Sequence, residues 1–358
     1  MRTLNASCLI VGTSIGAGML GLPVETSRGG FFPALVLLLI NWAIMTCTAL
    51  MLVELLNKSK RDANFVSLSE KILGNGFKIL TFIFYTGLFL SLTLAYVKGG
   101  GVFISDCFNG IPIAFGCLIF LGIFVPLIVS GAKFLTIGNT LLTIGLVVSF
   151  VLLVLLGIKK VNIELLSRID WKFGWMSYPM FITAFGFHSI LPSLNSYLQN
   201  KKALRLSVVI GTTVTLLIYL AWQMIVMGIV PVYGENGLAQ TLAADQTAVT
   251  PLKLFLKSPL LTVLSQVFYF AALTTSFLGV GLGLVDFVLD SFKIKQKLVN
   301  RLFVAFLIYV PALWIAQTNL RVFYLSIKYG GGLACFYLLV LLPILLFFRK
   351  KRSRIFVK

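Results

Sequence analysis

The stretch from Gly12 to Pro23 reads GTSIGAGMLGLP and places four glycines and a proline inside an apolar segment near the start of the chain. Each glycine costs a helix about 1 kcal/mol and a proline about 3 kcal/mol. A continuous helix is therefore disfavoured, although the segment is long and apolar enough to span a membrane. Because unwound backbone is tolerated at membrane depth only where it lines a polar cavity, the stretch predicts a broken transmembrane helix.

The composition of the whole chain fits a lipid environment. Of 358 residues, 59% are hydrophobic and 11% are charged, and the mean hydropathy is +1.00. A soluble domain carries about 25% charged residues. The apolar runs are helix-long and not short and alternating, so we predict an all-α polytopic membrane protein. The first run has no cleavage signal after it and is expected to be retained.

Ten apolar runs of spanning length follow one another, and the sixth repeats the broken pattern of the first. In the sixth run, Pro179 precedes the sequence from Phe185 to His188, and Pro192 follows it. Breaks at the first position of each half predict a five-plus-five inverted repeat whose broken helices meet at the membrane midplane. Small residues and prolines also occur in membrane helices that simply pack closely, and this alternative stays open. The runs cover approximately residues 5–27, 31–56, 77–100, 111–131, 137–158, 174–198, 204–230, 259–288, 301–318 and 321–348.

These runs predict a first repeat over 1–158, an extracytoplasmic connector over 159–173, a second repeat over 174–348 and a basic tail over 349–358. The net charge of +19 is attributed to span ends, where Lys and Arg meet anionic head groups. With the N-terminus inside, about two-thirds of the basic residues fall on the inner side, which predicts that both termini are cytoplasmic. We expect contact with membrane lipid, anionic lipid at the cytoplasmic face included, and neither nucleic acid nor an obligate protein partner.

The longest outer connection, residues 231–258, is expected to form one or two short helices over the outer mouth between Leu238 and Phe255, or a plain surface loop. The five cysteines indicate neither a disulfide framework nor a metal site, and no cofactor is expected. No catalytic set of residues is recognisable, so an intramembrane enzyme is disfavoured. A passive channel is also disfavoured, because channels favour rings of charges or carbonyls formed by an oligomer.

Free amides at a half-helix N-terminus attract a carboxylate, and carbonyls that end the opposing half-helix accept hydrogen bonds from an ammonium group. The two breaks together therefore suit a zwitterion such as an amino acid.

The run from Gly12 to Pro23, with AFGFHSILPSL at 184–194 and TSFLGV at 275–280, strongly resembles the bacterial tyrosine/tryptophan permeases. These are the aromatic amino acid permeases of the amino acid/polyamine/organocation superfamily. The resemblance implies a LeuT-like fold with helices 1 and 6 broken. It also implies proton-coupled import of tyrosine and/or tryptophan across the bacterial inner membrane. The sequence departs from the family pattern at two points. Ala184 stands where the family usually has serine, and the apolar runs end with the tenth, where relatives continue into an eleventh span.

The resemblance implies a substrate site at the two breaks. Gly16, Ala17 and Gly18 would offer amides to the carboxylate, with hydroxyls nearby for the ammonium group, and the second break would form the facing wall. An aromatic substrate also needs stacking faces beside a polar end. The residues predicted to bind substrate are Thr13, Ser14, Gly16, Ala17, Gly18, Tyr96, Phe185, Gly186, Phe187, His188 and Phe277.

His188 and Glu54 are candidates for proton coupling. His188 is the only histidine and could titrate or bind a substrate polar group, or it could close the broken helix against a backbone carbonyl. Glu54 is either a proton-pathway group or an interfacial partner of Lys58 or Arg61. The four-residue spacing to Lys58 favours the interfacial reading.

Sodium coupling is kept as an alternative to proton coupling. Thr275 and Ser276 align with positions where sodium-coupled relatives of this fold place hydroxyl ligands. The resembling permeases use protons, so the prediction is H⁺ symport. A second alternative is import of serine, threonine or another neutral amino acid, because more distant relatives share the glycine motif of the first span.

Overall fold

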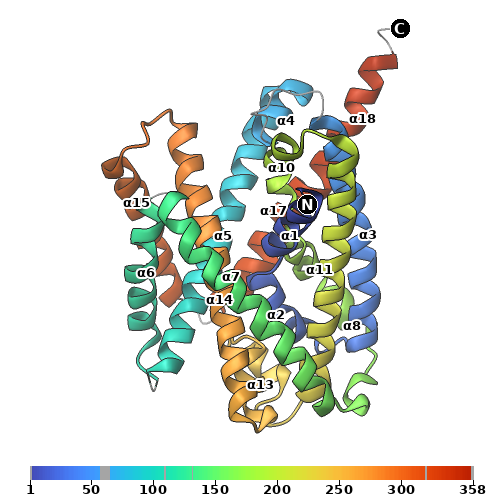
Figure 1. The fold of residues 1–358 in the computed structure, drawn as a ribbon, viewed down its shortest axis with the longest axis vertical. Helices are drawn as coiled ribbons and strands as arrows, with labels where there is room; N and C mark the ends of the chain where they lie inside the picture. Colours follow the sequence, from blue (N-terminus) through green and yellow to red (C-terminus); the bar gives the residue numbers. More distant parts are fainter. Residues whose placement is uncertain (1, 57–64, 109, 131, 319–320, 356–358) are drawn as a thin grey trace.

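The computed structural model describes residues 2–56, 65–108, 110–130, 132–318 and 321–355. Over these residues the chain is helical and contains no strand, which confirms the all-α prediction. The long helices run roughly along the tall axis of the molecule (Figure 1). The C-terminus and α4 lie at one end, called here the upper end, and α8 and α13 lie at the opposite, lower end.

Eight helical segments of the described chain are long and apolar enough to cross a membrane, and each matches one predicted run. They agree with the predicted spans to within a few residues at most ends. The seven continuous helices are α3 (Phe31–Leu56), α5 (Asn75–Cys107), α6 (Ile113–Ser130), α7 (Ala132–Gly157), α11 (Lys201–Ile229), α14 (Pro259–Ser291) and α15 (Leu298–Thr318).

The eighth segment, Val322–Lys350, contains two π-helical stretches. A π-helix places more residues in each turn than an α-helix does. The pieces are α16 (Val322–Leu325), η4 (Ser326–Gly331), α17 (Gly332–Cys335), η5 (Phe336–Leu341) and α18 (Leu342–Ile355). Lys328 lies in the first π-helical stretch.

One boundary differs clearly from the prediction. The third run was expected to end near residue 100, where Gly99, Gly100 and Gly101 follow one another, but α5 continues to Cys107. These glycines serve close packing and not termination. A Cβ on Gly101 would collide with Cys117 of α6, and one on Gly100 would collide with the ring of Phe120.

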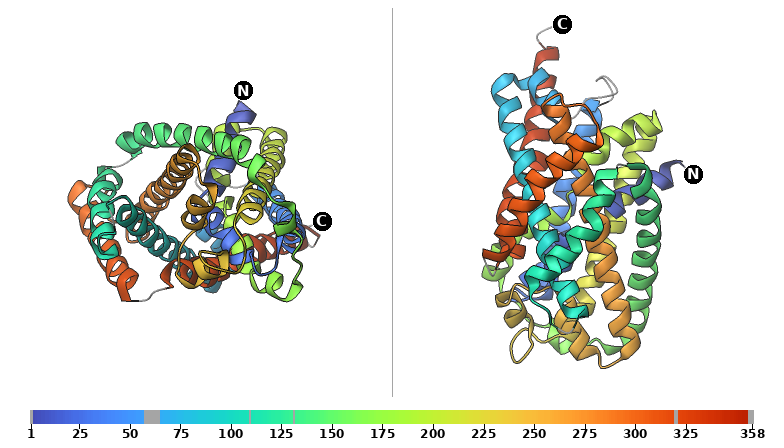
Figure 2. Two further views of the ribbon diagram at one scale, coloured as in Figure 1. Left: turned by 90° about the horizontal axis from the view of Figure 1, so that it is seen from below. Right: turned by 90° about the vertical axis from the view of Figure 1, so that its left-hand side faces the viewer.

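The first run forms two helices, α1 (Arg2–Ser14) and α2 (Ala17–Thr26), which are bent by 54° relative to each other. The sixth run forms α9 (Tyr178–Ala184), a 3₁₀ turn η3 (His188–Ile190) and α10 (Leu191–Leu198). Residues 185–187 between α9 and η3 are not helical. Both predicted breaks are therefore present, at residues 15–16 and 185–187. The broken spans lie among the continuous ones, since α2 contacts α5, α9, α11 and α14 (Figure 2).

Shorter helices connect the spans. The remaining elements are α4 (Phe65–Leu73), η1 (Ile158–Lys160), η2 (Ile163–Leu166), α8 (Trp171–Met176), α12 (Leu238–Ala243) and α13 (Val249–Leu256). The last two are the short helices expected in the loop 231–258. Between them, the amide of Ala248 donates to the carbonyl of Leu20 at 3.3 Å, so this loop packs on α2.

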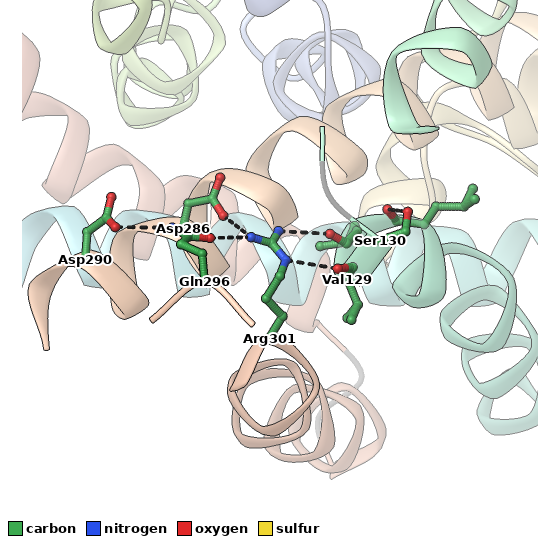
Figure 3. Close-up of polar contacts among 8 residues, drawn as sticks. Val129, Ser130, Asp286, Asp290, Gln296 and Arg301 are labelled. Atoms are coloured by element: carbon green, nitrogen blue, oxygen red, sulfur yellow. Dashed lines mark hydrogen bonds and ion pairs between the residues drawn. The ribbon is translucent and has the colours of Figure 1, made fainter. Parts of the chain in front are cut away.

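At the upper end, Arg301 ties three spans together on the side of α6 and α15 (Figure 3). Its guanidinium donates to the carbonyls of Ile128 (3.1 Å) and Val129 (2.9 Å) at the end of α6. It also bonds the Asp286 carboxylate of α14 at 2.5 Å and Gln296 at 2.7 Å. Carbonyls in the last turn of a helix lack hydrogen-bond donors within that helix, and the Arg301 guanidinium donates to two of them. Asp286 is thus paired with an arginine.

Candidate substrate site at the two helix breaks

The two breaks are in direct contact. Gly18, in the first turn of α2, lies against Ala184, the last residue of α9. A Cβ on Gly18 would stand 2.9 Å from the Cα and 3.3 Å from the Cβ of Ala184. The close approach therefore requires glycine at position 18. It brings the N-terminal amides of one half-helix next to the C-terminal carbonyls of the other, as the inverted-repeat fold predicts.

Tyr219 of α11 joins the two half-helix ends. Its hydroxyl lies 2.6 Å from the carbonyl oxygen of Ser14 and 2.6 Å from that of Ala184. These residues end α1 and α9, where carbonyls have no partner within the helix. The Tyr219 ring is fully buried and packs edge-to-face on Phe185, with ring centroids 5.1 Å apart. Sequence reasoning missed Tyr219; the available signal was a tyrosine in mid-span, which needs a hydrogen-bond partner when buried.

The same face of α11 also contacts α2, the second half of span 1, beyond the break. Trp222, three residues after Tyr219, donates its indole N–H to the carbonyl of Met19 at 3.0 Å. Gln223 donates to the hydroxyl of Thr26 at 2.9 Å. Positions three and four residues apart lie on one helix face. α11 therefore supplies side-chain bonds to the broken helix both at and beyond the break.

Gly16 lies where α5 and α14 approach the first break. A Cβ at this position would stand 2.7 Å from the Ser276 hydroxyl and 3.1 Å from the Tyr96 hydroxyl. Ser276 donates to the carbonyl of Ile15 at 3.0 Å. The hydroxyl of Thr275, by contrast, bonds back to Ala271 of its own helix at 2.8 Å. Of the two sodium-ligand candidates, the structure thus brings Ser276 to the break and commits the Thr275 hydroxyl to α14.

The hydroxyls expected to face the ammonium group are used inside α1. Ser14 donates to Ile10 at 3.0 Å and Thr13 to Leu9 at 2.7 Å, both backbone carbonyls. Ser14 is buried, and Thr13 is exposed. The backbone carbonyl of Ser14, and not its side chain, points to the meeting place of the breaks. On the other side of that place, Gly16 precedes the first amides of α2, Ala17 and Gly18, which have no partner within the helix.

The second break is buried and held by α3. Phe185, Phe187 and His188 have no exposed surface. His188 Nε2 lies 3.0 Å from the Thr48 hydroxyl, while Nδ1 has no hydrogen-bond partner among the described residues. Asn41 of α3 donates to the carbonyl of Phe181 at 2.8 Å. His188 therefore meets a hydroxyl of α3. Gly186 lies in the same turn, where its amide bonds the carbonyl of Thr183 at 3.2 Å.

Phe277 lies in an aromatic cluster with rings of α6 and α15. Its ring centroid is 5.0 Å from that of Phe120 on α6 and 5.6 Å from that of Tyr309 on α15. Because Ser276 on the same helix faces Ile15, the next residue is turned by about 100° to another side. The described contacts bring Tyr96, Phe185 and Phe187 to the site region and place Phe277 on the α6–α15 side.

Glu54, near the end of α3, is held by ion pairs with α11. Its carboxylate forms ion pairs with Lys201 and Arg205, one turn apart at the start of α11. The spacing along α3 did not indicate these partners. The expected partners Lys58 and Arg61 lie outside the described residues.

Buried charges that sequence reasoning had not placed in the site lie toward the lower end. Glu25 of α2 pairs with Lys328 of η4, and their side chains are 7% and 15% exposed. Asp245, between α12 and α13, accepts hydrogen bonds from the amides of Phe323 (2.9 Å) and Tyr324 (3.1 Å) at the start of the last span. Burial raises the pKa of Asp245 to about 6, against the lowering effect of these amides. The first contact ties the last span to α2, and the second ties it to the loop 231–258.

Continuous spans surrounding two broken ones whose breaks meet define a multi-pass membrane transporter of the LeuT-like class. The tryptophan/tyrosine permease family model matches residues 1–356, and the chain belongs to that family. Tyrosine-specific transport system 1 of Haemophilus influenzae is 33% identical over 98% of this chain and 89% of its own length. The tryptophan-specific transport protein of the same organism is 28% identical over 92% of this chain and 83% of its own length.

A solved structure shares the fold. The crystal structure of MhsT in complex with L-phenylalanine matches with a TM-score of 0.64 over 97% of both chains, at 14% sequence identity. The predicted family, the fold class and the assignment as a transporter and not an enzyme are thereby confirmed.

Proposed function

We propose that this protein imports an aromatic amino acid, tyrosine and/or tryptophan, by proton symport through alternating access. The observation that carries the proposal is the convergence of two half-helix carbonyls, from Ser14 and Ala184, on one buried point. Such carbonyls favour an ammonium group, and the first amides of α2 beside them favour a carboxylate. One zwitterion fits both ends at once.

The choice of an aromatic substrate rests on two supports. Tyr96, Phe185 and Phe187 bring aromatic rings to the region of the breaks, where they can stack on a substrate ring. Several relatives are named as tyrosine- or tryptophan-specific transport proteins. Both supports favour an aromatic over a small neutral amino acid.

Protons are the proposed coupling ion. Of the two hydroxyls predicted as sodium ligands, that of Thr275 is bonded within its own helix, and that of Ser276 is held at the break. A sodium site needs several oxygen ligands, whereas proton coupling needs a titratable group such as His188.

The proposed location is the bacterial inner membrane with both termini in the cytoplasm, because the basic residues gather on that side. On this orientation, the upper end is cytoplasmic, and its basic residues, among them Lys201, Arg205 and Arg349, face anionic lipid.

The test is uptake of radiolabelled tyrosine and tryptophan into proteoliposomes, with an inward proton gradient, an inward sodium gradient, or neither. We expect concentrative uptake driven by the proton gradient and abolished by a protonophore. Unlabelled tryptophan and tyrosine should compete, while serine, threonine and glutamine should not. Uptake driven only by sodium would refute the coupling, and transport of small neutral amino acids in place of aromatic ones would refute the substrate class. Protein-free liposomes provide the background.

A further inference from the structure

We propose that Tyr219 is the positioning residue of the ammonium subsite, and that its hydroxyl selects substrates carrying an α-ammonium group. The inference rests on the proposed function, because it assigns a task within the same site. Tyr219 comes from α11, a continuous span outside both breaks. It was not among the residues that the sequence indicated.

The hydrogen-bond count at Tyr219 is uneven. One phenolic O–H can donate one proton, yet two carbonyl oxygens lie 2.6 Å from it. All three groups are buried, so at any moment one carbonyl lacks a full donor. An acceptor left unsatisfied in a buried place is costly. An ammonium group brings three donors, enough for the under-supplied carbonyl and also for the lone pairs of the Tyr219 hydroxyl, which Tyr219→Phe would remove.

The electrostatics point the same way. Both carbonyls end a helix, α1 for Ser14 and α9 for Ala184, and helix C-termini carry partial negative charge. Tyr219 holds these two negative ends toward one point. A cation is therefore favoured there over an anion.

The hydroxyl is held in place independently of a ligand. α11 follows α1 along its length, since Gly211 packs against Ile10, and a Cβ on this glycine would stand 2.8 Å from the Cβ of Ile10. Ser207 donates to the carbonyl of Thr3 at 3.1 Å. The edge-to-face contact with Phe185 fixes the phenol ring from the other side. Tyr219 therefore positions the carbonyls before substrate arrives.

The test compares three ligands on purified protein: tyrosine, tyramine, which keeps the ammonium group but lacks the carboxylate, and 3-(4-hydroxyphenyl)propionate, which lacks the ammonium group. Tyr219→Phe removes the hydroxyl and keeps the ring. We expect it to weaken binding of tyrosine and tyramine roughly 10-fold, as for a lost hydrogen bond to a charged site, and to leave the des-amino ligand unchanged. An equal loss for all three ligands, or no loss for tyrosine, would overturn the proposal.

The matched control is Trp222→Phe, which removes another α11 bond to span 1, at Met19, away from the meeting carbonyls. Any effect of this change should be equal for the three ligands. If Tyr219→Phe does not fold, Tyr219→Gln and Tyr219→Leu replace it, since both lack the ring and only glutamine keeps a donor. Equal ammonium preference in these two variants would also overturn the proposal.

Failure of the proposed function gives a different result. If the unaltered protein binds neither tyrosine nor tryptophan but binds another amino acid, the aromatic assignment fails. The Tyr219 comparison is then made with that amino acid, its amine and its des-amino analogue. A selective loss of the ammonium-bearing ligands would still support the role of Tyr219.

Discussion

Adding one methyl group to Gly18 should separate the two half-helices that form the site. The new Cβ would stand 2.9 Å from the Ala184 Cα and 3.3 Å from its Cβ, against 3.4–4 Å for an ordinary contact. Neither atom of Ala184 can rotate away, so α2 and α9 must move apart by about 0.5 Å. Overpacking of this kind costs about 1–3 kcal/mol. The gain in helix propensity, at most about 1 kcal/mol, offsets only part of that cost.

We therefore expect Gly18→Ala to lose about 1–2 kcal/mol, which is roughly a 5- to 30-fold weakening of substrate binding if the loss falls on the site. The assay is thermal unfolding of the detergent-solubilised protein together with the dissociation constant for tyrosine. A lower melting temperature or weaker binding would both follow from the forced separation.

Gly12→Ala is the matched control in the same motif. Nothing lies within 4 Å of a Cβ at Gly12, which sits inside α1. This change should be neutral or should stabilise the protein by up to about 1 kcal/mol. The loss of stability in Gly16→Ala should lie between those of Gly12→Ala and Gly18→Ala. The hydroxyl of Ser276 can rotate away from the new methyl group, but it then loses its hydrogen bond to Ile15. Equal effects at positions 12 and 18 would refute the reasoning.

Three further predictions test the charged contacts. Glu25→Gln or Lys328→Met alone should lower the free energy of unfolding by roughly 3 kcal/mol, because each leaves a buried charge without its partner. In a double-mutant cycle, the double variant should recover most of the lost free energy. Additive losses would contradict a buried pair. Burial raises the pKa of Asp245 from 3.8 to about 6, so the packed loop 231–258 binds a proton more tightly than the same loop when it is opened. The protection of the amides of this loop against hydrogen exchange should therefore fall as the pH rises from about 4 to 6. Asp245→Asn should abolish this pH dependence of protection. Glu54→Gln should cost about 1 kcal/mol or less and keep proton-driven uptake, since the carboxylate is 30% exposed; loss of proton coupling would restore its pathway role.

The sequence predicted the breaks well because helix breakers leave a local signal. GTSIGAGMLGLP and the prolines around Phe185 fix where the backbone cannot continue, and the structure has its breaks at 15–16 and 185–187. The glycines of α5 show the limit of that signal. The apolar run was expected to end near residue 100, but α5 continues through three consecutive glycines that pack against α6 and other neighbours.

Side-chain partners across helices could not be predicted, because they depend on rotation and tilt. α11 is apolar on most sides, so periodicity does not reveal that Tyr219 faces both breaks. Phe277 was predicted to bind substrate, and its packing on Phe120 of α6 was not foreseen. Glu54 was assigned to partners close in sequence, while the structure pairs it with Lys201, 147 residues away.

The two π-helical stretches of the last span change how that span is to be mapped. Each adds about one residue to a turn, so the faces that follow are rotated by about 100° relative to an ideal wheel, and by about 200° after the second. A helical wheel that starts at Val322 would therefore place the residues of α18 on nearly the opposite face of the helix. When cysteine pairs for cross-linking or lipid-facing probes are chosen in this span, the helical wheel has to be restarted after Gly331 and again after Leu341.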